Sequence, residues 1–218
     1  MGSSLLQLIA LAAVAIFLIF RLRNTLGTRD GFENPNRTNP TVESFKAAET
    51  EAANEPVDRD IVKFVNADSD AAEALAGMKQ ADRGFLVSDF VEGAARAYKM
   101  ILLSFAKGEL DEIKDYISEE VYQSFEATVA ERKTDGLNHV TNFLGLRESG
   151  IRSASLEGGS EAEITVEFVA ELISFVTDEN GDVVEGDEEA VRRQRDVWTF
   201  ARNLDSSDPN WTLVATGE

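Results

Sequence analysis

The chain has 218 residues, of which 40 are Asp or Glu and 21 are Lys or Arg, so its formal net charge is −19. Nucleic acid and anionic lipid headgroups carry fixed negative charge and are repelled by a protein with this net charge, so we expect no nucleic-acid partner. The absence of cysteine fits a reducing compartment.

The first twenty residues contain no charged side chain, and fifteen of the sixteen positions from Leu5 to Phe20 are apolar. Twenty helical residues extend about 30 Å, the thickness of the hydrocarbon core of a bilayer. A cleaved signal peptide would begin with positive charge, and a buried core helix would be shorter with a polar face. We therefore predict a transmembrane anchor over residues 1–23. Its apolar side chains include Leu5, Leu6, Ile9, Val14, Phe17 and Phe20.

The charges that flank this span predict its orientation. Arg21, Arg23 and Arg29 follow the apolar run, and no positive side chain precedes it. Because positive flanks stay in the cytoplasm, we expect a single-pass protein with its N-terminus outside and its C-terminal domain in the cytoplasm.

Residues 24–64 are predicted to form a flexible acidic linker. Pro35, Pro40 and Pro56 fall here among many Asn and Thr residues, a composition that buries too little apolar surface to offset the entropy of ordering. Residues 42–53 could form a weak helix within it. The folded domain is then expected over residues 65–218.

The first half of this domain has the period of helices. Residues 68–80 place apolar side chains on one face after a cap at Asp68 or Ser69. Residues 88–107 give the strongest helical pattern, with Ser88 as the expected N-cap and Gly108 at the end. A short acidic helix is expected over residues 109–117, and a further helix from Ser118 to Gly136.

The second half has the period of strands. In Glu161–Leu172, apolar residues alternate with mostly acidic ones, as in a half-buried strand. Asn180–Gly181 predicts a hairpin turn, and residues 191–204 and 211–216 predict two more strands. Residues 137–156 are expected to supply one or two others. Helices followed by antiparallel strands predict an α+β domain with helices packed on a curved antiparallel sheet.

Few residues offer chemistry. Residues 178–189 resemble a calcium loop, but Val183 occupies the position that needs glycine, so an acidic hairpin is the better interpretation. His139 is the only imidazole and has no partner for metal binding or catalysis. A proton-transfer site built from Tyr98, Tyr122 and Asp196 remains the alternative for an enzyme.

One stretch departs from the acidic average. Residues 79–107 contain five cations and three acids, a net charge of +2. A basic amphipathic helix can lie on an anionic membrane surface, although the apolar stripe of this helix can equally be core. The candidate membrane-surface contacts are Lys79, Arg83, Arg96, Lys99 and Lys107.

The order of several short motifs resembles one family. The motifs are Val91–Tyr98, Phe105–Leu110, Ser118–Phe125, Ile164–Val166, Gly181–Gly186, Asp196–Phe200 and Asp208–Trp211. Together they resemble the Tim44-like domain family in its membrane-anchored alphaproteobacterial form, called TimA, over residues 65–218. The mitochondrial relative is the membrane-associated subunit of the presequence translocase that docks a chaperone.

This resemblance implies a cone of helices on a sheet, similar to the nuclear-transport-factor and ketosteroid-isomerase superfamily. It implies no catalysis, no cofactor, and lipid contact through helices 69–80 and 88–107. Such cones can hold a large apolar pocket. Its expected lining is Phe90, Tyr98, Ile101, Phe105, Val166, Phe168, Trp198 and Phe200.

The expected function is that of a non-enzymatic adaptor at the bacterial inner membrane, whose cytoplasmic domain binds lipid, an unidentified protein partner, or both. Mitochondrial members carry a longer basic chaperone-binding region where this chain has a short acidic linker. An apolar small-molecule or acyl-chain binding module is the alternative, and a cone-fold enzyme is the third hypothesis.

Overall fold

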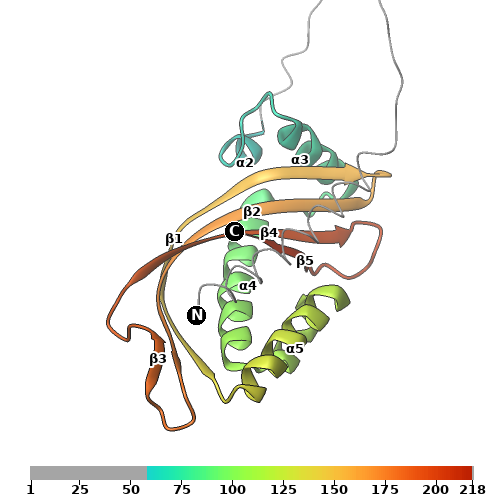
Figure 1. Ribbon diagram of the computed structural model, residues 1–218. Coiled ribbons are helices and arrows are strands. Elements are labelled where there is room, and N and C mark those ends of the chain that lie inside the picture. Colours follow the sequence, from blue (N-terminus) through green and yellow to red (C-terminus); the bar gives the residue numbers. More distant parts are fainter. Residues whose placement is uncertain (1–57, 218) are drawn as a thin grey trace, which may run out of the picture.

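A computed structural model of the protein describes residues 58–217 (Figure 1). The anchor predicted for residues 1–23 and the weak helix predicted for residues 42–53 lie outside this range. Within residues 58–217, no helix combines the length and the apolar character needed to cross a bilayer.

Four α-helices and two 3-10 turns come first in the described part of the chain. They are α2 (Arg59–Val62), α3 (Asp70–Ala81), α4 (Val87–Lys107), η1 (Leu110–Glu112), η2 (Lys114–Tyr116) and α5 (Glu119–Thr134). The helices α3, α4 and α5 confirm the predicted helical segments. The short helix predicted for residues 109–117 is instead the pair of 3-10 turns.

Two of the predicted caps are confirmed, and one is wrong. Ser69 and Ser118 each accept a hydrogen bond from an amide in the first turn of their helix, α3 and α5. Helix α4 begins one residue before Ser88, and no side chain from its own N-terminus caps it. Its first two amides donate instead to the carboxylate of Asp60 in α2.

Helix α2 falls in the part of the chain that was predicted to be linker. Its N-cap is Asp58, and Ile61 is buried in the hydrophobic core with 4% of its surface exposed. The packed domain therefore includes residues before position 65, because α2 contributes both a core side chain and the carboxylate that caps α4.

Five strands form one antiparallel sheet. They are β1 (Asn138–Glu157), β2 (Glu161–Thr177), β3 (Val183–Gly186), β4 (Arg192–Asn203) and β5 (Thr212–Gly217). The order is β1-β2-β4-β5, and the short β3 pairs with the end of β2 beyond β4. The segment 137–156 thus forms a single long strand, and three register irregularities along its pairing with β2 accompany the curvature of the sheet.

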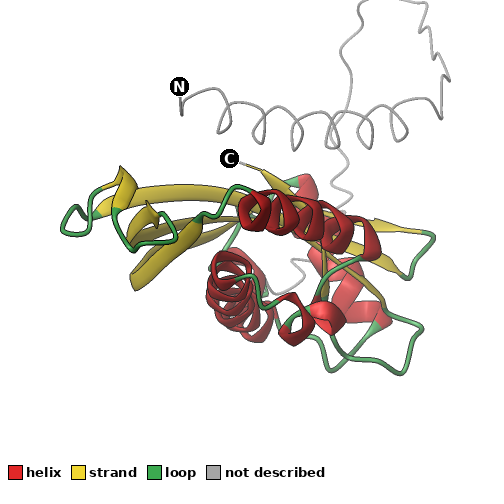
Figure 2. Cartoon of the chain, turned by 60° about the horizontal axis from the view of Figure 1, so that its bottom comes forward, coloured by secondary structure: helices red, strands yellow, loops and turns green. Residues whose placement is uncertain are grey.

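The sheet arches over helices α4 and α5 (Figure 1). Figure 2 shows the same helices gathered against part of the sheet, while the strands near β3 extend beyond them. Alternate residues of β2 point toward the helices and are buried, as the sequence period predicts. They are Ala162, Ile164, Val166, Phe168, Ala170 and Leu172. The α+β architecture with helices packed on a curved antiparallel sheet is therefore confirmed.

Candidate functional site

The centre of the arch is filled by aromatic side chains. Tyr98 of α4 stacks on Phe168 of β2 with ring centroids 4.5 Å apart, and Trp198 of β4 lies 4.7 Å from Tyr98. None of these three rings is more than 5% exposed. Because the rings pack against one another, the space that was expected to be an open apolar pocket is part of the core.

Most of the expected lining residues belong to this core. Ile101 and Val166 are fully buried, and Phe105 packs against Phe125 of α5 in a tilted arrangement with centroids 4.3 Å apart. Phe90 and Phe200, two of the eight residues expected to line a pocket, also line one of the two hollows described below.

That hollow is a groove of about 390 Å³ between α4 and the segment that enters β5. One wall is the N-terminal half of α4, and the other is the turn that precedes β5, with η2 at one end. The lining residues are Phe90, Gly93, Ala94, Arg96, Ala97, Met100, Tyr116, Phe200, Pro209, Asn210 and Trp211. The lining is mostly apolar, with Arg96 as its one cation, which is the usual chemistry of a site for an apolar ligand.

Aromatic contacts hold the two walls together. Trp211 packs on Phe90 with centroids 4.7 Å apart and on Phe85 at 5.8 Å. Phe90 in turn lies edge-on to Phe200 of β4 at 6.0 Å. The floor is therefore fixed by rings from α4, β4 and the turn before β5.

A glycine on α4 leaves room in the groove. A Cβ built on Gly93 would meet only the tip of Arg96, at 3.9 Å. The absence of a side chain at this turn of α4 keeps the groove open, because larger lining side chains occur one turn before it, at Phe90, and two turns after it, at Met100.

Three of the predicted membrane-surface cations lie on α4, and one of them, Arg96, lines this groove. Arg96, Lys99 and Lys107 are exposed and, at 100° per residue, fall within about 80° of one another around α4. Arg96 pairs with Glu92, Lys107 lies 3.5 Å from Glu109, and Lys99 lies over the ring of Phe143. These three cations form a basic edge along α4.

The two other predicted cations lie elsewhere. Arg83 is exposed in the turn after α3. Lys79 is largely buried and pairs with Asp58 at 2.7 Å and Asp60 at 2.9 Å. The sequence therefore placed Lys79 among free surface cations, whereas the structure places it in an ion-pair cluster between α2 and α3.

Asp60 is the centre of that cluster. Its carboxylate accepts from Nζ of Lys79 and from the amides of Val87 and Ser88, at 2.8 to 3.0 Å. Burial alone would raise the pKa of Asp60, but the bonds from Lys79 and the two amides outweigh burial and lower it to about 2. The carboxylate is thus charged at neutral pH and faces the positive end of the α4 dipole.

The structure brings two of the three candidate catalytic residues together. The hydroxyl of Tyr98 donates to Oδ2 of Asp196 at 2.5 Å, and Nε2 of Gln194 donates to both carboxylate oxygens. Tyr122 lies apart from them, under Nζ of Lys114. Burial and the adjacent charge of Asp196 raise the pKa of Tyr98. Neither Tyr98 nor Asp196 lines either of the two hollows described for residues 58–217, and both side chains are buried in the core.

His139 occupies a structural position at the start of β1. Burial, and then the charge of Arg132, lower its pKa to about 4. Arg132 itself lies over the ring of Phe105 at 4.4 Å.

Asp178, the first residue of the sequence that resembles a calcium loop, accepts hydrogen bonds from the amides of Asn180 and Asp182 and closes the hairpin turn.

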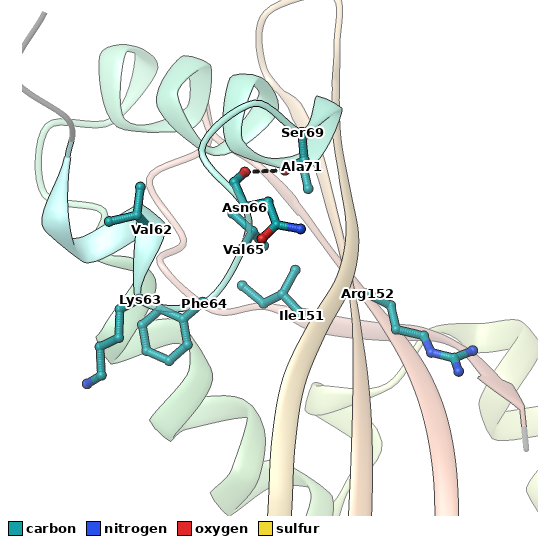
Figure 3. A pocket seen from close by; sticks show the side chains of 9 residues that line it. All are labelled: Val62, Lys63, Phe64, Val65, Asn66, Ser69, Ala71, Ile151 and Arg152. Carbon is teal, nitrogen blue, oxygen red and sulfur yellow. Dashed lines mark hydrogen bonds between the residues drawn. The ribbon is translucent and has the colours of Figure 1, made fainter.

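A second hollow lies where α2 leads into α3 beside β1 (Figure 3). Its volume is about 380 Å³, and the side chains of Asn66 and Ile151 meet in it. Arg152 at its rim is bonded to Glu167 of β2. Since the lining is dominated by a tight turn with an exposed cation on each side, the groove beside α4 is the stronger candidate for an apolar ligand.

Sequence reasoning missed the residues on the far wall of the groove. Pro209 and Asn210 were recognised only as part of the motif Asp208–Trp211, and Trp211 also as the start of a strand. A tryptophan directly after a turn was the one local signal, because a large ring at such a place needs a partner to cover it.

Comparison with known proteins identifies the domain. Residues 71–218 match the family model of the Tim44-like domain. Over 157 residues, the chain is 24% identical to mitochondrial import inner membrane translocase subunit TIM44-1 of Arabidopsis thaliana, covering 69% of this chain and 33% of that protein. Over 117 residues it is 31% identical to subunit TIM44 of Homo sapiens, covering 52% of this chain and 25% of that protein.

The chain therefore spans about a quarter to a third of the length of these relatives. A solved structure, the intermembrane space region of chloroplast protein ARC6, superposes with a TM-score of 0.39 at 14% identity, covering 58% of this chain and 94% of that one. Such a score does not establish a common fold. The family match covers most of the chain, however, and the chain belongs to the Tim44-like domain family.

Proposed function

We propose that this protein is a non-enzymatic adaptor tethered to a bacterial inner membrane. The helix over residues 1–23 is the tether, the linker follows, and the α+β domain lies in the cytoplasm, where it binds a protein partner, lipid, or both. The observation that carries the proposal is the match of residues 71–218 to the Tim44-like family, whose relatives named above are translocase subunits.

The surface of the domain supports lipid contact beside the tether. The basic edge formed by Arg96, Lys99 and Lys107 lies on the exposed side of α4, in a chain with a net charge of −19. Such an edge is a local site at which the domain can approach anionic headgroups. A membrane tether would hold it near the bilayer at high effective concentration, so each contact can be weak.

Affinity capture tests the adaptor function. The full chain is crosslinked in its native membrane and purified, and a form without residues 1–20 is treated in parallel. We expect the full chain to recover a reproducible set of proteins from the membrane fraction. We expect the shortened form to be absent from that fraction. Recovery of no reproducible protein partner would rule out an adaptor. Retention of the shortened form on membranes after a high-salt wash, which screens contacts between the basic edge and headgroups, would rule out the tether.

A second function is favoured by the groove beside α4. A hollow of about 390 Å³ with a floor of aromatic rings suits an apolar chain, and Arg96 at its edge suits an anionic head on that chain. In this alternative the domain binds an acyl chain or a similar small molecule. Native mass spectrometry of the full chain released from membranes should then reveal a bound adduct, whereas a protein without one would count against this function.

A further inference from the structure

The hairpin that carries β3 has a surface unlike the rest of the domain. We name residues 178–191 the acidic arm. This segment contains seven carboxylates and no Lys or Arg. Its acidic residues are Asp178, Glu179, Asp182, Glu185, Asp187, Glu188 and Glu189. The arm lies at the end of the long strands β1 and β2 (Figures 1 and 2), and Glu179 at its start lies close to Gly136, which follows α5.

Apolar side chains lie exposed among these carboxylates. Val183, Val184 and Val191 are 42%, 55% and 56% exposed. They are three of the seven large apolar residues exposed in the described part of the chain, and they fall within nine positions of sequence. Single exposed apolar residues are ordinary, but a group of them rimmed by charge is typical of an interaction surface.

The arm is also a free edge of the sheet. Strand β3 pairs only with the end of β2, and no other strand in residues 58–217 lies on its outer side. The pairing skips Val184, since Val176 lies opposite Glu185 and Thr177 opposite Val183. Val184 is therefore the extra residue of this irregularity, and its exposed side chain is accessible to a partner.

The base of the arm is fixed rather than loose. Gly186 has φ of +88°, and a Cβ at this residue would lie 2.7 Å from the carbonyl oxygen of Ser174 in β2. Only glycine allows this close approach. The carboxylate of Asp178 also closes the turn by accepting from the amides of Asn180 and Asp182. The valines and acids are therefore held on a defined scaffold.

From these features we infer that the acidic arm is a docking surface for a basic polypeptide segment of a partner protein, one in which Lys or Arg residues adjoin aliphatic ones. The valines supply apolar contact, and the carboxylates attract positive charge. A second copy of this chain is a poor occupant, because its net charge of −19 is repelled by the same carboxylates. The inference rests on the proposed adaptor function, since it names the chemistry of one partner contact.

Direct binding to a defined peptide tests the arm. The full chain, purified in a neutral detergent, is titrated with a short blocked peptide of alternating lysine and valine. Two control peptides replace either every lysine or every valine with serine. We expect only the lysine–valine peptide to bind well, with an affinity that falls as salt is added. Hydrogen exchange should become slower within residues 178–191 when it binds.

Paired variants separate the arm from general charge. A triple variant with Val183→Ser, Val184→Ser and Val191→Ser should bind the peptide about tenfold or more weakly. The control Leu144→Ser, which alters an exposed apolar residue on β1, should have little effect on binding. The change Glu185→Gln, Glu188→Gln and Glu189→Gln should weaken binding similarly at low salt. The matched change Asp111→Asn, Asp115→Asn and Glu120→Gln removes as many exposed acids elsewhere.

The outcomes discriminate clearly. Absence of peptide binding, equal loss in the matched control, or protection outside the arm would overturn the inference. Binding that drives self-association of the chain would point to a second copy instead. The adaptor function is tested separately by capture from membranes. If the arm binds no peptide while capture recovers a partner, only the inference about the arm is rejected.

Discussion

The hydroxyl of Tyr98 donates to Oδ2 of Asp196 at 2.5 Å, joining helix α4 to strand β4 across 98 positions of the sequence. The bond lies inside the aromatic core, where Tyr98 is fully buried. Gln194 donates to the same carboxylate from two residues away on β4. A buried carboxylate needs such donors, so this pair ties the helix layer to the sheet.

Removing the phenol should therefore destabilise the domain. We expect Tyr98→Phe to cost about 1–3 kcal/mol, because the ring contacts remain while the buried carboxylate of Asp196 loses one of its hydrogen-bond donors. The measurement is the free energy of unfolding in urea at neutral pH. Tyr122→Phe is the matched control, since Tyr122 is only partly buried and its ring contact with Lys114 survives the change. Equal stability of Tyr98→Phe and wild type would contradict a structural role for the bond.

The capping of α4 by Asp60 gives a second prediction. Asp60→Asn should lower the free energy of unfolding by about 1–2 kcal/mol at neutral pH, since it weakens the bonds to Lys79 and to the first amides of α4. Asp70→Asn, at an exposed residue in the first turn of α3, should change stability by less than about 0.5 kcal/mol.

The pH dependence has a definite sign. The pKa of Asp60 is about 2 in the folded protein and 3.8 ordinarily, so the folded state favours the charged form. Its contribution is present above pH 3.8 and is lost as the pH falls toward 2. The stability difference between wild type and Asp60→Asn should therefore narrow across this window. A difference that stays constant from pH 5 to pH 2 would show that the carboxylate charge is not involved.

These two contacts mark where sequence reasoning succeeds and fails. Ser69 and Ser118 were predictable as caps because each bonds an amide three residues away. Asp60 was not, because it caps a helix that begins 27 residues later and lies in a segment with the composition of a linker. A cap within the first turn of its own helix can be read from local sequence. A cap that comes from a distant helix becomes visible only in the folded domain.

The candidate site shows the same division. The period of α4 and β2 correctly placed Tyr98 and Phe168 on inward faces, yet it could not tell whether these rings line a cavity or fill it. That depends on the summed volume of side chains from several elements. The groove instead needs Trp211, which comes from a turn more than a hundred residues after Phe90. No local pattern predicts such a contact.

The single histidine gives a third prediction. His139 should titrate near pH 4, because burial and the charge of Arg132 lower its pKa from the ordinary 6.5. Since the unfolded chain binds this proton more readily, stability should be lost as the pH falls from 6.5 to 4. Proton NMR can follow it without ambiguity, because the sequence contains one histidine.

Substitution of the nearby cation tests the cause of this shift. Arg132→Gln should raise the pKa of His139 only in part, since burial is the larger influence and remains. An imidazole that titrates near 6.5 in the wild-type protein would contradict the burial of His139. An unchanged pKa in Arg132→Gln would remove the electrostatic part of the explanation.

The groove beside α4 supplies the last prediction, through Gly93. In Gly93→Leu the new side chain enters the groove, where a Cβ meets only the tip of Arg96. If an acyl chain binds there, Gly93→Leu should reduce its binding by about tenfold or more. Gly93→Ala is the matched control, because one methyl group leaves most of the 390 Å³ open and favours the helix by about 1 kcal/mol. Native mass spectrometry with a fatty acid added to the full chain measures both variants. Undiminished binding by Gly93→Leu, in a protein that melts no lower than wild type, would place the apolar ligand outside this groove.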